Sequence, residues 1–268
     1  YCSGYKYEVF DRFVGSLMDT GFSGNIFLVI KTQSDITNVK RLQKKYDNVI
    51  DIIDTVPKKT HICCHRFFVY KQILDHEQKL VNRRKIKIND YLFLCDSRDV
   101  LFQKNIEKYQ YDINTDIYAF LEGLTIVQET RSNTPWIKKL ETVIGEQFYD
   151  TIKNNNIICC GTTLGKKYAI HQYVNMMCEI IKKHNITTNL DQGIHNYILY
   201  LNKLDGINVE YSSNVDNLVN TPFLDVHRLN DDNHVININN DVSYVVHQYD
   251  RFSIDLKQRL SVKYNFML

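Results

Sequence analysis

Apolar positions along the chain follow two patterns, the period of an amphipathic helix and the continuous run of a buried strand. Residues 7–19 have the helical spacing and are followed by Gly21, a helix-stop signal. Residues 25–30 are continuously apolar, as expected of a strand that is covered on both faces. Ser34 is a candidate N-cap for a helix over residues 34–46, and a second strand is predicted at residues 49–53.

The alternation of predicted strands and helices continues along the chain and ends in a region of short strands. We predict helices at residues 67–80, 166–184 and 192–201, and strands at residues 90–95, 117–121, 157–160, 235–239 and 242–246, the last two as a hairpin. This order is typical of an α/β fold with a mostly parallel, Rossmann-like central sheet, flanking helices and a small β-rich C-terminal part. Ligands of such folds bind at the carboxyl ends of the strands.

The composition is that of an ordinary globular protein. With only three prolines and ten glycines and no Ser/Gly/Pro-rich linker, we expect a single domain over residues 1–268. The net charge is +2 without a basic block, so we expect neither nucleic acid nor an anionic membrane as a partner. No apolar run approaches the roughly 20 residues that cross a bilayer, so we expect no membrane span within this chain.

The cysteines bear on the redox compartment of the protein. The chain has seven, and four of them form the adjacent pairs Cys63–Cys64 and Cys159–Cys160. An odd number argues against a fully paired disulfide framework. Adjacent cysteines on a strand point to opposite faces, which suits metal chelation poorly. We therefore expect buried thiols in a reducing, cytoplasmic compartment. No signal-peptide pattern follows Tyr1, and because this residue is not Met, an excised domain and an upstream anchor both stay open.

Two carboxylates follow the apolar strand predicted at residues 90–95. Asp96 comes directly after it and Asp99 three residues later, so a continued strand would aim them at opposite faces. They converge on one ion only if the chain turns at Ser97 and Arg98. Two hard oxygen ligands are too few to cage Ca²⁺ but suit Mg²⁺ or Mn²⁺ that also binds water and a diphosphate. The alternative is a helix-capping pair with Arg98 as its salt-bridge partner.

These residues and several other blocks resemble the motifs of GT-A glycosyltransferases of viral, plant and algal type. The segment Asp96-Ser97-Arg98-Asp99-Val100-Leu101-Phe102-Gln103 resembles their DxD region. The further blocks follow in the same order from about residue 2 to residue 251, and this order makes the resemblance more specific than any single motif. They are Ser3-Gly4-Tyr5, Arg66, Asn133 with Trp136-Ile137, Cys160-Gly161-Thr162-Thr163-Leu164-Gly165, Asp191-Gln192-Gly193-Ile194-His195-Asn196 and His247-Gln248-Tyr249-Asp250-Arg251.

The resemblance implies a GT-A fold and metal-dependent transfer of a sugar from a nucleotide-sugar donor, UDP-linked, to a saccharide or glycoprotein acceptor. It also implies a virus-encoded protein in the host cytoplasm. The implied site residues are Asp191 and Gln192 for catalysis; Ser3, Gly4, Tyr5, Arg66, Asp96 and Arg98 for the nucleotide; Gly161, Thr162, Thr163 and Trp136 for the donor or acceptor sugar; and Asp96, Asp99 and His247 for the metal.

One departure from the family pattern bears on the metal. The usual motif has two Asp residues two positions apart, but Arg98 occupies the second slot here, so Asp99 is the safer metal ligand. For Asp96 a contact with the ion and a contact mainly with the ribose both stay open. An imidazole from His247 beside two carboxylates favours Mn²⁺ over Mg²⁺. Arg66 is expected to pair with the diphosphate through its fork of donors.

Two more segments have structural alternatives. The glycines at 161 and 165 do not match a P-loop. We predict a turn ahead of the helix at residues 166–184, which either faces the sugar or the diphosphate or is a plain structural turn. Asp191 precedes a predicted helix and is either its N-cap or a carboxylate at the donor sugar. That carboxylate would be the base of an inverting enzyme or would orient the donor in a retaining one. A nucleotidyltransferase and an inactive sugar-nucleotide-binding domain remain the alternative functions.

Overall fold

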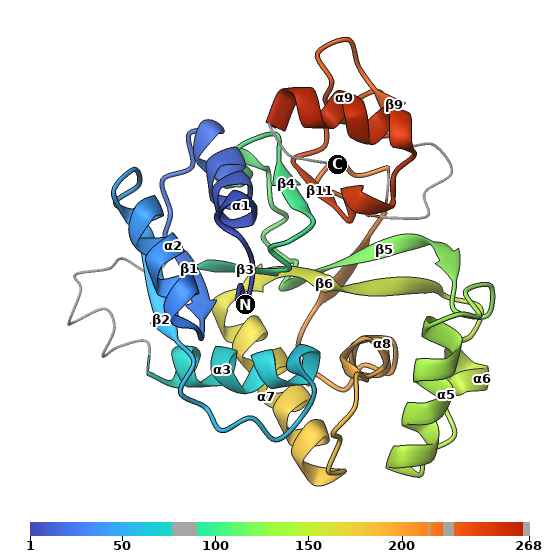
Figure 1. Ribbon diagram of the computed structural model, residues 1–268. Coiled ribbons are helices and arrows are strands. Elements are labelled where there is room, and N and C mark those ends of the chain that lie inside the picture. Colours follow the sequence, from blue (N-terminus) through green and yellow to red (C-terminus); the bar gives the residue numbers. More distant parts are fainter. Residues whose placement is uncertain (77–89, 214, 222–227, 265–268) are drawn as a thin grey trace. The chain divides into compact units, whose positions relative to one another are not determined.

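The computed structural model describes residues 1–76, 90–213, 215–221 and 228–264, which form a mixed α/β fold (Figure 1). The chain divides into two compact units, each built from segments that are distant in sequence. The first unit contains residues 1–55, 95–111 and 212–268, and the second contains residues 56–94 and 112–211. The single domain predicted over residues 1–268 stays a prediction.

The first unit begins with an alternation of helices and parallel strands. Its elements are α1 (Tyr7–Asp19), β1 (Ile26–Ile30), α2 (Gln33–Gln43) and β2 (Val49–Ile53). The two strands pair in parallel from Ile26↔Val49 to Ile30↔Ile53, as predicted for a Rossmann-like sheet. The predicted N-cap of α2, Ser34, is wrong, because Thr32 accepts the Asp35 amide hydrogen while the Asp35 side chain accepts that of Thr32. This reciprocal capping box satisfies two amide groups at the helix start.

The remainder of the first unit consists of short strands and one C-terminal helix. Its elements are β4 (Val100–Phe102), η1 (Ile106–Lys108), β8 (Val219–Asn220), β9 (Arg228–Leu229), β10 (Val235–Ile236), β11 (Val245–His247), η2 (Tyr249–Arg251) and α9 (Ile254–Tyr264). Strand β11 pairs antiparallel with β4 and parallel with β8. The predicted hairpin is reduced to a bridge between Ile236 and Val242. Helix α9, which the β-rich prediction did not include, buries Leu260 against Leu101 and Val246.

The second unit is built on the long antiparallel pair of β5 and β6. Its elements are α3 (Ile62–Asp75), β3 (Tyr91–Cys95), β5 (Ile117–Thr125), α5 (Asn133–Ile144), α6 (Tyr149–Ile152), β6 (Asn156–Lys166), α7 (Lys167–Lys183), α8 (Asp191–Tyr200) and β7 (Val209–Ser212). The strand order is β3-β6-β5-β7. No helix in the described ranges is both long enough and apolar enough to cross a membrane.

The turn predicted at residues 161–165 is wrong, because β6 runs without interruption to Lys166. The glycine at 165 has a different purpose there. A Cβ atom at this position would lie 2.4 Å from the carbonyl oxygen of Asp116, so only glycine lets β5 approach this closely. The helix predicted at residues 67–80 begins earlier, at Ile62, and its last four positions lie outside the described residues.

Candidate functional site

The chain bends between β3 and β4, and this bend brings Asp96 and Asp99 together. Residues 97–99 form the bend, and the strand β4 starts at Val100. The turn that convergence required is therefore present. The capping alternative is wrong, because a strand and not a helix follows the two carboxylates.

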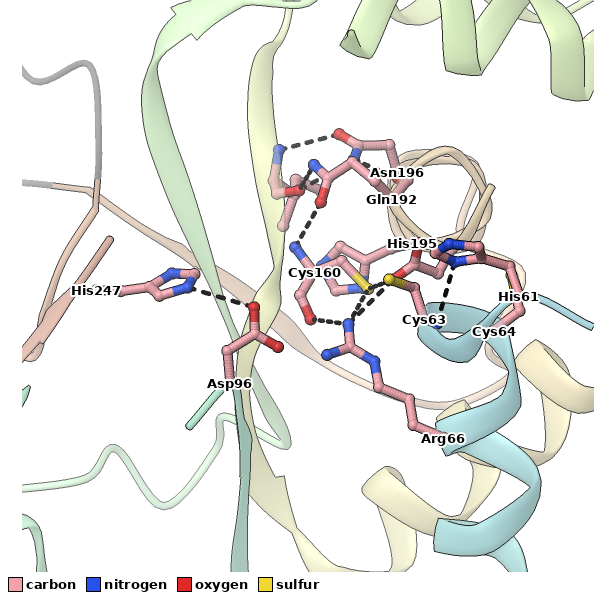
Figure 2. A network of polar contacts seen from close by, with 12 residues as sticks. His61, Cys63, Cys64, Arg66, Asp96, Cys160, Gln192, His195, Asn196 and His247 are labelled. Carbon is pink, nitrogen blue, oxygen red and sulfur yellow. Dashed lines mark hydrogen bonds and ion pairs between the residues drawn. The ribbon is translucent and has the colours of Figure 1, made fainter. Parts of the chain in front are cut away.

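His247 completes a group of three possible metal ligands. One ligand atom each from Asp96, Asp99 and His247 lies within 4.8 Å of the others. The His247 Nε2 atom is 3.6 Å from Asp96 Oδ2 and 4.0 Å from Asp99 Oδ1, and Figure 2 shows the ring directed at Asp96. Strand pairing positions the histidine, because His247 on β11 is in register with Val100 on β4, next to Asp99.

Burial and charge at this group favour a bound cation. Asp99 is only 7% exposed, and burial raises the pKa of its carboxyl group, opposed by nearby His247 and reinforced by Asp96 and Asp250. A divalent ion among the ligands would offset this repulsion between carboxylates. Two carboxylates and an imidazole form a donor set suited to Mn²⁺, so the residues present fit the predicted metal.

Hydrogen bonds connect the bend to α1 and to the segment that carries His247. The carbonyl oxygen of Arg98 accepts from the Arg12 guanidinium at 3.0 Å and from the Tyr249 hydroxyl at 2.9 Å. The amide of Gln248, which has a positive φ of 57°, donates to the Asp99 carbonyl at 2.7 Å. Tyr249 and Gln248 lie in the block that resembles the C-terminal metal-binding motif, whereas no sequence signal indicated Arg12.

The Arg98 side chain pairs with carboxylates. Its NH2 group lies 2.8 Å from Asp250 and 3.4 Å from Asp99, and the side chain is half exposed. The nucleotide-binding role of Arg98 stays a prediction.

The predicted nucleotide-binding loop lies in the same unit as the metal-ligand group. Ser97 Oγ donates to the carbonyl oxygen of Tyr1, which ties this loop to the bend. Burial raises the pKa of the Tyr5 hydroxyl, and the charges of Asp96 and Asp99 act in the same direction. Tyr5 is therefore within electrostatic reach of both carboxylates.

The predicted catalytic residue Asp191 belongs to the second unit. It is the first residue of α8, and its Oδ2 atom lies 3.0 Å from the NH2 group of Arg66 on α3. Both side chains are largely buried, and the Cys160 thiol lies 3.7 Å from the same carboxylate oxygen. The N-cap alternative is wrong, because the cap position is Leu190. Arg66, predicted at the diphosphate, pairs here with Asp191.

Gln192 and Asn196 on α8 bind the backbone of β6 (Figure 2). The Gln192 amide accepts from the Cys160 N–H at 2.9 Å and donates to the Ile158 carbonyl at 2.7 Å. Asn196 accepts from the Ile158 N–H and donates to its carbonyl. Both atoms of the Gln192 amide are therefore engaged in holding α8 to the strand, and its catalytic role stays a prediction.

The predicted sugar-binding residues differ in exposure. Gly161, Thr162 and Thr163 are buried within β6, and Trp136 is half-buried on α5. Their binding roles stay predictions. Sequence reasoning did not single out Tyr173, whose hydroxyl is 2.7 Å from the Nδ1 atom of His195 in the block that contains Asp191.

Comparison with known proteins identifies the fold of this chain. No family model and no curated protein matches the sequence. A crystal structure of the galactosyltransferase LgtC in complex with donor and acceptor sugar analogs is similar with a TM-score of 0.57 and 11% identity, covering 100% of this chain and 95% of that one. The apo structure of the bifunctional glycosyltransferase WbbM has a TM-score of 0.48 and 12% identity, covering 91% of this chain and 44% of that one. A glycosyltransferase involved in the glycosylation of the major capsid of PBCV-1 has a TM-score of 0.46 and 12% identity, covering 89% of this chain and 99% of that one. The likeness to LgtC extends over the whole chain, so this protein has the GT-A glycosyltransferase fold that its sequence motifs predicted.

Proposed function

We propose that this chain transfers a hexose or pentose from a nucleotide sugar, UDP-linked, to a hydroxyl group of a saccharide or glycoprotein, with Mn²⁺ as cofactor. The convergence of Asp96, Asp99 and His247 in a chain with this fold carries the proposal. When bound, Mn²⁺ would neutralise the charge that develops on the departing nucleoside diphosphate.

The three ligand residues differ in what they contribute. Asp99 and His247 are buried, so they hold their ligand atoms in fixed positions. Asp96 is one-third exposed and has a second carboxylate oxygen that can accept a hydrogen bond from a ribose hydroxyl. We assign Asp99 and His247 to the ion and Asp96 to both the ion and the nucleotide.

Asp191 acts at the donor sugar in this proposal. The 3.0 Å contact with Arg66 engages one carboxylate oxygen and fixes the orientation of the side chain, so it supports the orienting role of a retaining enzyme. The anomeric configuration of the product, measured by NMR, decides between this role and that of the base of an inverting enzyme.

A panel of nucleotide sugars tests the donor and the metal together. Thermal unfolding is followed with each donor, with and without Mn²⁺. A ligand at 100 times its Kd stabilises the folded state by about 2.7 kcal/mol, so one donor should raise the Tm only with the metal. No shift with any nucleotide would contradict the proposal. Release of pyrophosphate from a nucleoside triphosphate and a sugar phosphate would instead indicate a nucleotidyltransferase.

Two variants test the assigned residues. His247→Ala should weaken Mn²⁺ binding in titration calorimetry, with the exposed His76→Ala as the matched control. Asp191→Asn should abolish sugar transfer and spare nucleotide binding, whereas Asp205→Asn on the surface should leave both intact. Unchanged Mn²⁺ affinity would remove His247 from the site, and an active Asp191→Asn enzyme would remove Asp191.

A further inference from the structure

Helix α2 is hydrogen-bonded to the N-terminal loop of the first unit through a fully buried carboxylate. Asp35 is 0% exposed. Its Oδ2 atom accepts from Ser3 Oγ at 2.7 Å, and its Oδ1 atom accepts from the Gly4 amide at 2.9 Å. Hydrogen bonds from Thr32, Ser3 and Gly4 lower the pKa of Asp35 in spite of its burial. The Ser3 hydroxyl group therefore donates its hydrogen to a side chain of α2.

Helix capping alone does not account for these contacts. The capping box of α2 needs only the reciprocal bonds between Asp35 and Thr32. Ser3 and Gly4 are 32 and 31 residues away in sequence. One turn later on the same helix, Asn38 is 8% exposed and donates from Nδ2 to the Tyr5 carbonyl at 3.2 Å. Two side chains on one face of α2 thus hold three consecutive loop residues.

The loop held in this way has one end on β1 and turns at a glycine. The Cys2 amide donates to the Val29 carbonyl at 2.8 Å. Gly4 has a φ of +82° with open space where a Cβ would be, so its backbone conformation, and not crowding, requires glycine. The same loop is bonded to the bend that carries Asp96 and Asp99.

We propose that Asp35 and Asn38 are positioning residues that keep Ser3, Gly4 and Tyr5 in the one conformation that binds the nucleotide. This inference rests on the proposed function. Neither residue needs to touch the ligand. Without them the loop samples other conformations, and the apparent Kd rises in inverse proportion to the fraction of molecules that remain competent to bind.

Calorimetry on three variants tests the proposal, with UDP in the presence of Mn²⁺ as one probe and Mn²⁺ alone as the other. Asp35→Asn replaces an acceptor oxygen with an amide donor, Asn38→Ala removes the bond to Tyr5, and Ser3→Ala removes the hydroxyl. If the competent fraction falls to about one tenth, UDP binds about tenfold more weakly. The Mn²⁺ affinity should stay at the wild-type value, because no metal ligand is changed.

Matched controls and a double-mutant cycle separate positioning from general stability. Ser34→Ala and Thr37→Ala lie on the exposed face of α2 and should bind UDP like the wild type. Because Ser3 and Asp35 share one hydrogen bond, the double variant should lose less affinity than the two single losses combined. Asn38→Ala and Ser3→Ala leave the capping box intact, so they supply the result if Asp35→Asn does not fold.

Each outcome of this experiment either supports the positioning role or overturns it. Weaker UDP binding with unchanged Mn²⁺ binding supports the proposal. Wild-type UDP affinity in the variants would overturn it, and so would a parallel loss of Mn²⁺ affinity, which would indicate damage to the unit as a whole. Failure of the wild-type protein to bind UDP would overturn the proposed function, and this inference would fall with it.

Discussion

His195, buried in the second unit, makes the stability of the protein depend on pH in a calculable way. Its side chain is fully buried, and Tyr173 is its hydrogen-bonding partner at Nδ1. Burial lowers the pKa of the imidazole from 6.5 to about 3, and the positive charge of Arg66 adds to the effect. The unfolded chain takes up a proton at this position near pH 6.5, whereas the folded chain does not until near pH 3.

The sign and size of the effect follow from proton linkage. Between these two pKa values the unfolded state binds one more proton, so the free energy of unfolding rises with pH and falls on acidification. Each pH unit in this range is equivalent to about 1.4 kcal/mol. At pH 5, which is 1.5 units below the unfolded pKa, the buried histidine therefore costs about 2 kcal/mol. This is a large part of a typical folding free energy of about 5–15 kcal/mol.

His195→Asn removes the titrating group and keeps a short amide next to Tyr173. Urea unfolding at pH 7.5 and at pH 5 measures the difference in stability between the variant and the wild type. We expect the variant to lose about 1–3 kcal/mol at pH 7.5 through poorer packing. This deficit should shrink by about 2 kcal/mol at pH 5. His76→Asn, at an exposed position, is the control and should follow the wild-type curve. A deficit that is the same at both pH values would refute the argument.

Three further substitutions test packing and loop support. Gly165→Ala places its Cβ 2.4 Å from the Asp116 carbonyl oxygen and should cost about 3 kcal/mol in urea unfolding; wild-type stability would show that β5 can move. Gly15→Ala, inside α1, meets one hydroxyl at 3.8 Å and should stabilise by up to about 1 kcal/mol, whereas a loss would indicate tighter packing. Tyr249→Phe deletes the bond to the Arg98 carbonyl and should weaken Mn²⁺ binding about fivefold in calorimetry; unchanged affinity would show that the remaining contacts suffice.

Elements whose signals are local could be predicted well from the sequence. The helix at residues 7–19 and the strand at residues 49–53 have the predicted bounds, because apolar periodicity and stop signals act within a few residues of the chain. The prediction of a turn at residues 161–165 was wrong because glycine is found both in turns and where two backbones lie close together. Gly165 permits the close approach of β5, and the sequence of residues 161–165 does not show which strand lies beside it.

For the candidate site, the sequence by itself determined the residue types and their positions at strand and helix ends. The sequence placed Asp96 and Asp99 at the end of one strand, but their convergence depended on a turn at Ser97 and Arg98, which the structure shows as a bend. The family resemblance implied that His247 joins them, and the tertiary structure shows how such distant groups meet. His247 meets Asp99 because β11 pairs with β4, and Arg66 meets Asp191 because α3 and α8 lie in one unit. Such contacts span more than a hundred residues, and their geometry depends on strand register and helix packing, which the sequence pattern of either partner alone does not specify.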